Sequence, residues 1–242
     1  MKDGTFVFPM EGTKKDGKAV SLIIYSAKES GNLSKGMSAD GCSDPSVVEW
    51  KDGKLMMMTA CDDGRRRVYE SGDKGNTWTE ALGTLSRVWG NNQKRHEKGV
   101  RSGFITATIK NKDVMLVTVP VYSKEKEKEK NEKGVLHLWL TDNTHIVDIG
   151  SVSGDDDVAA SSLLYRSAGS GNSNKRRLIA LYEKKGGGES SLGMVSVRLT
   201  AQLRRVKEVL ADLEESGRTC LQAVPLSRYC EESLNWQCLQ HC

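Results

Sequence analysis

The sequence predicts an all-β fold that ends in a helix, and three observations support this prediction. Short apolar runs recur with turn residues between them, as in a chain of many short antiparallel strands. One octet has the composition of a hairpin that its own side chains hold together. Near residue 200 the apolar period changes from that of a strand to that of a helix. The predicted strand runs are Thr5–Phe8, Ala19–Tyr25, Leu55–Ala60, Phe104–Ile109, Val114–Val119, Val135–Leu140, Ser161–Tyr165, Leu178–Tyr182 and Met194–Leu199.

The octet from Ser71 to Trp78 directly follows a strand-like segment and predicts a tight hairpin. Asp73 can accept hydrogen bonds from neighbouring backbone amides, and Gly75 can adopt a positive φ. Thr77 and Trp78 then begin the returning strand. A lone Asp-Gly turn would be weak evidence because such dipeptides are common in hairpins, whereas five fixed positions together are far more specific.

The chain after residue 199 predicts a helix, because its apolar residues recur at helical spacing while charged residues fall on the opposite face. We therefore assign residues 1–199 to the β region and residues 200–213 to the start of a helix. The apolar face consists of Leu203, Val206, Val209, Leu210 and Leu213.

Length and composition describe a globular protein. The 242 residues can hold one large all-β domain or part of one. With 37% hydrophobic residues, 28% charged residues and a dispersed net charge of +4, the composition is that of a globular protein and not that of a membrane or nucleic-acid specialist. No stretch approaches the roughly 20 apolar residues that a membrane span needs. The first residues lack the basic and then apolar pattern of a secretory leader.

Residues 214–242 break the preceding pattern and contain four of the six cysteines. The spacing of these cysteines and His241 fits no standard zinc motif, so we expect no metal site and no cofactor. A disulfide cluster would need an oxidising compartment. Cys42 and Cys61 could also pair, although nothing in the sequence requires it.

Several segments resemble the trypanosomal trans-sialidase family, and the octet matches the Asp box of sialidases. The resemblance runs from about residue 3 to about residue 212 and is highly specific. The segments that carry it are Ser38–Trp50, Arg65–Ser71, Trp78–Gly90, Leu138–Asn143 and Ser161–Tyr165.

This resemblance implies a partial six-bladed sialidase β-propeller, about its C-terminal half, over residues 1–199. Residues 200–213 would begin the family's long interdomain helix. Residues 214–242 are interpreted as a frameshifted and disordered tail. Asp boxes in this family lie on the outer hairpins of the blades, away from the catalytic mouth.

Sialidase chemistry makes specific demands on residue types. The carboxylate of sialic acid suits the bidentate fork of arginine better than the point charge of lysine. Retaining sialidases use a tyrosine nucleophile with a glutamate beside it and an aspartate as acid/base. By resemblance, Glu49 takes the place of the glutamate that activates the tyrosine, and Arg66 takes that of one of three carboxylate-binding arginines.

The remaining site positions depart from the family pattern. Lys133 stands where the family has a second arginine, so the charge remains but the fork is lost. Ala160 stands where the family has its tyrosine nucleophile, and alanine has no nucleophilic atom. Glu183 matches the glutamate that orients the third arginine, which would lie in the absent half. The resemblance therefore predicts a chain without sialidase or trans-sialidase turnover.

Three functions remain open at this point. The chain could be a non-catalytic member related to surface adhesion glycoproteins, an active exo-α-sialidase, or a non-functional truncated product. Family resemblance implies sialoglycoconjugates, or host surface and matrix glycoproteins, as partners, and no nucleic acid. Family members are lipid-anchored at the cell surface, but no leader or anchor signal was recognised here, which leaves the location unknown. An incomplete ring would also expose strand edges that invite aggregation.

Overall fold

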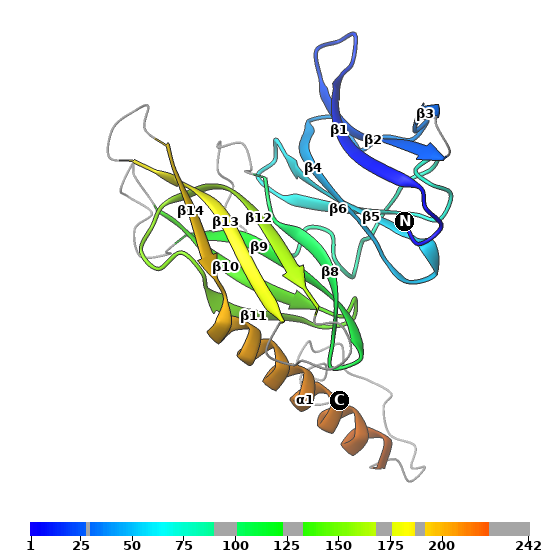
Figure 1. Ribbon diagram of the computed structural model, residues 1–242. Coiled ribbons are helices and arrows are strands. Elements are labelled where there is room, and N and C mark those ends of the chain that lie inside the picture. The colour runs from blue at the N-terminus through cyan, green and yellow to red at the C-terminus, as the bar shows by residue number, and fades with distance from the viewer. Residues whose placement is uncertain (28–29, 90–100, 123–132, 168–175, 187–191, 223–242) are drawn as a thin grey trace, which may run out of the picture.

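The computed structural model describes residues 1–27, 30–89, 101–122, 133–167, 176–186 and 192–222, which form four antiparallel sheets and a helix (Figure 1). The first sheet contains β1 (Phe6–Thr13), β2 (Ala19–Ala27) and β3 (Ser30–Leu33). The second contains β4 (Cys42–Glu49), β5 (Leu55–Cys61), β6 (Arg66–Ser71) and β7 (Thr79–Glu80), with the 3₁₀ turn η1 (Lys51–Gly53) between β4 and β5. The third contains β8 (Phe104–Ile109), β9 (Lys112–Tyr122), β10 (Gly134–Thr141) and β11 (Ile146–Ser151). The fourth contains β12 (Val158–Arg166), β13 (Arg177–Lys185) and β14 (Leu192–Arg198), and the helix is α1 (Thr200–Gln222).

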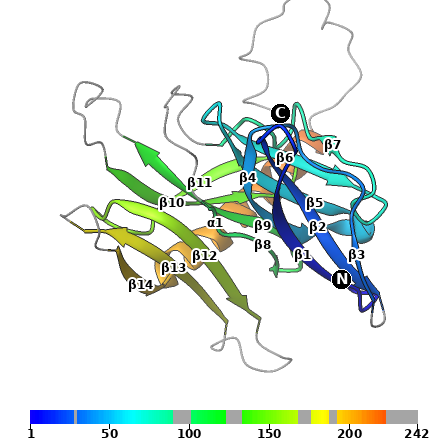
Figure 2. The same ribbon diagram turned by 90° about the horizontal axis from the view of Figure 1, so that it is seen from above.

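Each sheet is an antiparallel meander whose strands pair in chain order. The first strands of the last three sheets, β4, β8 and β12, lie beside one another, so the sheets fan outward from them (Figure 2). Hydrogen bonds join β4 and β12 to the segment that leads into β8: Ser46 Oγ donates to the Ser102 carbonyl at 3.1 Å, and the Ser161 amide donates to the Arg101 carbonyl at 3.0 Å. The arrangement is that of successive propeller blades in a ring that is not closed, as the sequence predicted.

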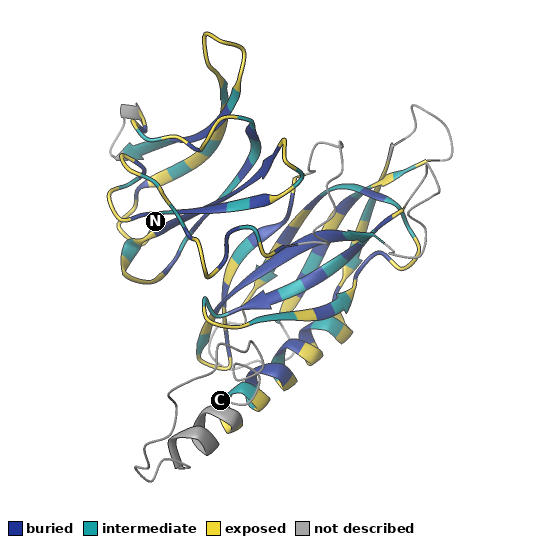
Figure 3. Ribbon diagram, turned by 180° about the vertical axis from the view of Figure 1, so that it is seen from behind, coloured by how far each residue is buried: buried dark blue, intermediate teal, exposed yellow. Residues whose placement is uncertain are grey.

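The hydrophobic core lies between the sheets, and its largest cluster joins the third sheet, the fourth sheet and α1. The helix presents to this cluster the face that its periodicity predicted, and Figure 3 shows the alternation of buried and exposed positions along it. Its buried residues are Leu203, Val206, Val209 and Leu210, with Leu213 packed beside them. No helix within the described ranges is long and apolar enough to cross a membrane.

The helix is longer than predicted. We expected it to give way to a disordered tail after residue 213, but its backbone stays helical through Gln222. Glu214, Glu215 and Leu221 are good helix formers and no proline occurs before Pro225, so the helix can continue although Gly217 disfavours it. The predicted disordered tail is therefore wrong for residues 214–222, whose backbone is helical. Residues 223–242 lie outside the described residues.

All nine predicted apolar runs lie within or overlap strands. The octet joins β6 to β7 as a hairpin, also as predicted. Neither the nine runs nor the octet predicted β3, β4 and β11. Of these, β4 is the one that matters most for the site, because it carries Glu49 and begins at the same end of the sheet as Arg66.

Candidate functional site

The Asp box holds its own turn together. Ser71 Oγ donates to Asp73 Oδ1 at 2.8 Å and accepts the Gly75 amide at 2.7 Å. Asp73 also accepts the Thr77 amide at 2.9 Å and the Thr77 hydroxyl at 2.7 Å, and these hydrogen bonds lower the pKa of the Asp73 carboxyl. Gly75 has a φ of 83°, and a Cβ there would approach within 2.7 Å of Ile23. These contacts confirm the predicted hairpin, whose turn is held by hydrogen bonds from its own side chains.

The second sheet has two distinct ends. At one end Ser71 leads into the octet, and we call this the Asp-box end. At the other end Cys42 pairs with Cys61 and Ala60 pairs with Arg66; we call this the Arg66 end. The two cysteines form a disulfide with a Cα–Cα distance of 4.0 Å.

Arg66 is a buried cation at the boundary between the second and third sheets. Its side chain is 8% exposed, and its Nε donates to Ser102 Oγ at 2.7 Å. Burial lowers the pKa of the guanidinium to about 10, while the nearby Tyr122 and Asp44 oppose that shift. Arg66 is thus still charged at neutral pH, and a buried guanidinium suits the bidentate binding of a carboxylate.

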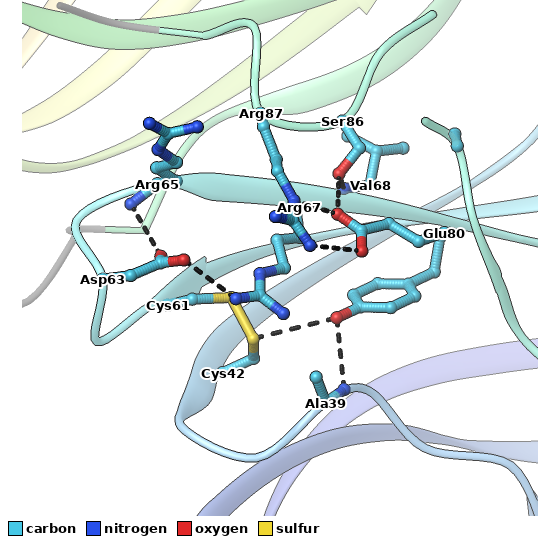
Figure 4. Close-up of polar contacts among 12 residues, drawn as sticks. Ala39, Cys42, Cys61, Asp63, Arg65, Arg67, Val68, Glu80, Ser86 and Arg87 are labelled. Atoms are coloured by element: carbon cyan, nitrogen blue, oxygen red, sulfur yellow. Dashed lines mark hydrogen bonds and ion pairs between the residues drawn. A yellow bond between two sulfur atoms is a disulfide. The ribbon is translucent and has the colours of Figure 1, made fainter. Parts of the chain in front are cut away.

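The arginines that flank Arg66 in the sequence are less buried than Arg66. Arg65 is exposed, and Figure 4 shows Arg67 directed at Asp63, which accepts a hydrogen bond from it at 2.8 Å. Nearby, Arg87 donates two hydrogen bonds to Glu80. The pairing with Asp63 raises the pKa of Arg67. Alternation along the strand places the buried Arg66 on the opposite face from Arg67.

Three other candidate residues lie at the Arg66 end of their own sheets. Lys133 is exposed and precedes Gly134, which pairs with Tyr122 at the end of β9. Ala160 is half-buried and precedes Ser161, whose amide reaches the Arg101 carbonyl. Glu183 is half-buried and stands next to Lys184, which pairs with Val158 at the start of β12.

Glu49 lies at the Asp-box end instead. It pairs with Leu55, whereas Arg66 pairs with Ala60, so roughly 17 Å of β5 separates the two positions at about 3.3 Å per residue. Glu49 Oε2 accepts the Lys2 amide at 2.8 Å, and the side chain lines a shallow cavity with Trp50 and Lys51. The structure therefore does not bring Glu49 to the end that holds the other four candidates.

Asp44 is the carboxylate that sequence reasoning missed at the Arg66 end. It sits in a bulge of β4 between Ser43 and Ser46, with a φ of 50°, and its charge acts on Arg66. The available signal was the Asp44-Pro45 pair, because such a pair commonly interrupts a strand.

No group of three His, Cys, Asp or Glu side chains in the described ranges could hold a metal ion. His241 and the tail cysteines Cys230, Cys238 and Cys242 lie outside those ranges. The Arg66 end offers a buried guanidinium with a hydroxyl neighbour, Ser102, and a carboxylate neighbour, Asp44.

Comparison with known proteins decides the family. A family model described as a BNR repeat-like domain matches residues 1–183. A sialidase of Trypanosoma cruzi is 38% identical over 227 residues, which are 93% of this chain and 18% of that protein. The chain belongs to the trypanosomal trans-sialidase family. Within this family, sialidase 85-1.1 of Trypanosoma cruzi is 39% identical over 222 residues, covering 87% of this chain and 27% of the relative.

The trans-sialidase family assignment extends to the fold. The solved Trypanosoma rangeli sialidase in complex with sialic acid is 35% identical and superposes with a TM-score of 0.76, covering 93% of this chain and 34% of that one. The partial propeller predicted from the sequence is thereby confirmed. The chain spans about a fifth to a quarter of its curated relatives and about a third of this solved structure.

Proposed function

We propose that this chain is a non-catalytic sialidase-family propeller segment that contacts the carboxylate of a sialoglycoconjugate without cleaving it. The observation that carries the proposal is Ala160. By family resemblance this position belongs to the tyrosine nucleophile, and a methyl group cannot form the covalent intermediate of a retaining sialidase. Loss of a nucleophile costs several orders of magnitude in rate, although a small residual rate can survive.

Binding of the anionic sugar is supported by Arg66. Its buried guanidinium can pair with a carboxylate in a site of low water content, where such a pair is stronger than at the surface. The Trypanosoma rangeli sialidase was solved in complex with sialic acid. Lys133 supplies a second, exposed positive charge at the same end. We propose sialoglycoconjugates as ligands, and glycoproteins of the host surface or matrix as the molecules that carry them.

The test combines a fluorogenic sialoside assay with sialic acid binding by saturation-transfer NMR, both on the full 242-residue chain. We expect no turnover, and binding that is lost in the Arg66→Met variant. Turnover that disappears in Arg66→Met but persists in the surface variant Arg204→Gln would overturn the inactive assignment and favour an active exo-α-sialidase. A circular dichroism melt without a cooperative transition would instead favour a truncated product without a stable fold.

A further inference from the structure

Residues 101–103 link three sheets to one another, and we call Arg101, Ser102 and Gly103 the bridge. The bridge leads directly into β8 of the third sheet. The Ser102 carbonyl accepts the Ser46 hydroxyl of β4 at 3.1 Å, and the Arg101 carbonyl accepts the Ser161 amide of β12 at 3.0 Å. The bridge therefore contacts the second and fourth sheets while it belongs to the third, and all of these contacts lie between neighbouring sheets of this chain.

Two buried hydroxyl groups fix the position of the bridge, and we call Thr118 and Ser161 the hydroxyl pair. The Gly103 amide donates to Thr118 Oγ1 on β9 at 2.9 Å and lies 3.4 Å from Ser161 Oγ on β12. The two hydroxyl oxygens are 2.9 Å apart, so one of them donates to the other. Thr118 is 0% exposed and Ser161 is 6% exposed. Because a buried amide needs an acceptor inside the protein, the Gly103 amide depends on this hydroxyl pair.

Close packing also restricts the bridge. A Cβ at Gly103 would lie 2.6 Å from Thr118 Oγ1 and 2.9 Å from the Leu163 amide nitrogen, so this position has no room for a side chain. The Thr118 amide donates to the Gly103 carbonyl at 2.9 Å. The backbone of the bridge therefore packs directly against β9 and β12.

The bridge carries the hydroxyl that accepts a hydrogen bond from Arg66. Ser102 is 6% exposed, and its Oγ accepts Arg66 Nε at 2.7 Å. Because the Nε–H bond lies in the plane of the guanidinium, this hydrogen bond helps to set the orientation of that plane. A guanidinium binds a carboxylate bidentately only when its fork faces the carboxylate, and a binding group has to be held within roughly 0.5 Å of its productive position. A series of hydrogen bonds thus connects the hydroxyl pair to Arg66 through Gly103 and Ser102.

We propose that Thr118 and Ser161 are positioning residues, which orient the guanidinium of Arg66 for its anionic ligand through the bridge. The inference rests on the proposed function, in which Arg66 binds the carboxylate of a sialoglycoconjugate. Replacing two hydrogen-bonded hydroxyls by apolar groups of the same shape costs little when they serve only each other. Here the same replacement leaves the Gly103 amide without an acceptor, so the bridge shifts and Ser102 moves with it. A substitution in the third or fourth sheet should therefore change ligand binding in the second.

The first measurement follows the Nε–H proton of Arg66 by NMR on the full chain with ¹⁵N-labelled arginine, and Arg66→Met identifies its signal. A buried, hydrogen-bonded proton exchanges with water only when its surroundings open, so we expect Thr118→Val to speed this exchange about tenfold or more. Thr118→Ser keeps the hydroxyl and should leave the exchange rate unchanged. Thr141→Val is the matched control, because Thr141 is 1% exposed and its hydroxyl accepts the Asn143 amide at 3.0 Å. Thr141 lies at the opposite end of β10 from Gly134, and so away from the Arg66 end.

The second measurement is the dissociation constant for sialic acid, obtained by isothermal titration of the same chains. Thr118→Val should weaken binding about fivefold or more, whereas Thr118→Ser and Thr141→Val should change the constant less than about twofold. The midpoint of thermal unfolding is recorded for each variant. Thr118→Val and Thr141→Val both remove the acceptor of a backbone amide and should both lower this midpoint, so a loss of stability alone does not explain a difference in binding between them.

Two results would overturn the positioning role. The first is equal exchange of the Arg66 proton in Thr118→Val and Thr141→Val. The second is faster exchange in Thr118→Val without weaker sialic acid binding, which would show that the orientation of Arg66 does not govern binding. If the unsubstituted chain does not bind sialic acid, the proposed function fails, and the exchange measurement still decides whether the hydroxyl pair orients Arg66. Ser161→Ala, a smaller change with the same expected direction, replaces Thr118→Val if that variant does not fold.

Discussion

Arg66 and Glu49 lie at opposite ends of one sheet, the first beside Ser102 and the second beside Lys2. A single sialic acid held by Arg66 is too small to reach Glu49 across roughly 17 Å of strand. Glu49 therefore cannot contact a sugar that is bound at Arg66. Substitutions of the two residues should affect sialic acid binding differently.

We predict that Arg66→Lys weakens sialic acid binding about tenfold or more, since a lysine keeps the charge but loses the bidentate fork. Glu49→Gln should change the dissociation constant less than about twofold. Isothermal titration of the full chain with sialic acid measures both. Equal losses in the two variants would contradict the arrangement, and unchanged binding in Arg66→Lys would remove Arg66 from the site.

Ser102 should stabilise the fold by accepting a hydrogen bond from the buried Arg66. Ser102→Ala removes the acceptor of the Nε hydrogen bond inside the protein, which costs about 1–3 kcal/mol of unfolding free energy. Adding Arg66→Met should recover most of this loss, because replacing a buried charge by a similar apolar side chain is often neutral or stabilising. Urea unfolding of the two single variants and the double variant measures the coupling. Additive losses would show that Ser102 does not support Arg66.

The sequence could predict what depends on local pattern. The five fixed positions of the Asp box specified a turn that its own side chains hold, and the spacing from Leu203 to Leu210 specified the buried face of α1.

The features that could not be predicted from the sequence depend on strand register and on β-bulges. The bulge at Asp44 adds one residue to β4 and breaks strand alternation, so the segment containing Asp44 was not predicted as a strand and its carboxylate was overlooked. Glu49 was assigned by resemblance alone, and only the pairing of β4, β5 and β6 shows at which end each residue falls.

Asp73 should make stability depend on pH. Hydrogen bonds from the Thr77 amide and hydroxyl hold its pKa below the ordinary value near 3.8, so its folded pKa is depressed. Its stabilising contribution is then fully present above about pH 4 to 5 and is lost as pH falls through the folded pKa. We predict that Asp73→Asn lowers the thermal midpoint at pH 7 and that the difference from the unsubstituted chain shrinks below pH 4. Asp212→Asn, at an exposed helix position, serves as the control, and a difference that is constant with pH would contradict the mechanism.

The disulfide between Cys42 and Cys61 should stabilise the Arg66 end. The bonded cysteines have a sequence separation of 19. Closing a loop of this length lowers the conformational entropy of the unfolded chain and should stabilise the folded state by about 3 kcal/mol. The measurement is urea unfolding with and without dithiothreitol, in a variant whose cysteines Cys220, Cys230, Cys238 and Cys242 are replaced by serine so that no other disulfide responds. We expect the reductant to lower the unfolding free energy by about that amount. No change on reduction would mean that the pair does not form or does not constrain the chain.

The helix should be an integral part of the folded unit, because its apolar face completes the core between the third and fourth sheets. Leu210 is 2% exposed, and Leu210→Ala should cost about 2–5 kcal/mol through lost burial and the cavity left behind. Arg204→Ala, at an exposed position one turn and a half earlier on the same helix, should stay within about 0.5 kcal/mol. Urea unfolding followed by circular dichroism and by tryptophan fluorescence distinguishes two outcomes. If Leu210→Ala shifts both transitions together, helix and sheets unfold as one unit; if only the circular dichroism transition moves, the helix melts independently and does not support the sheets.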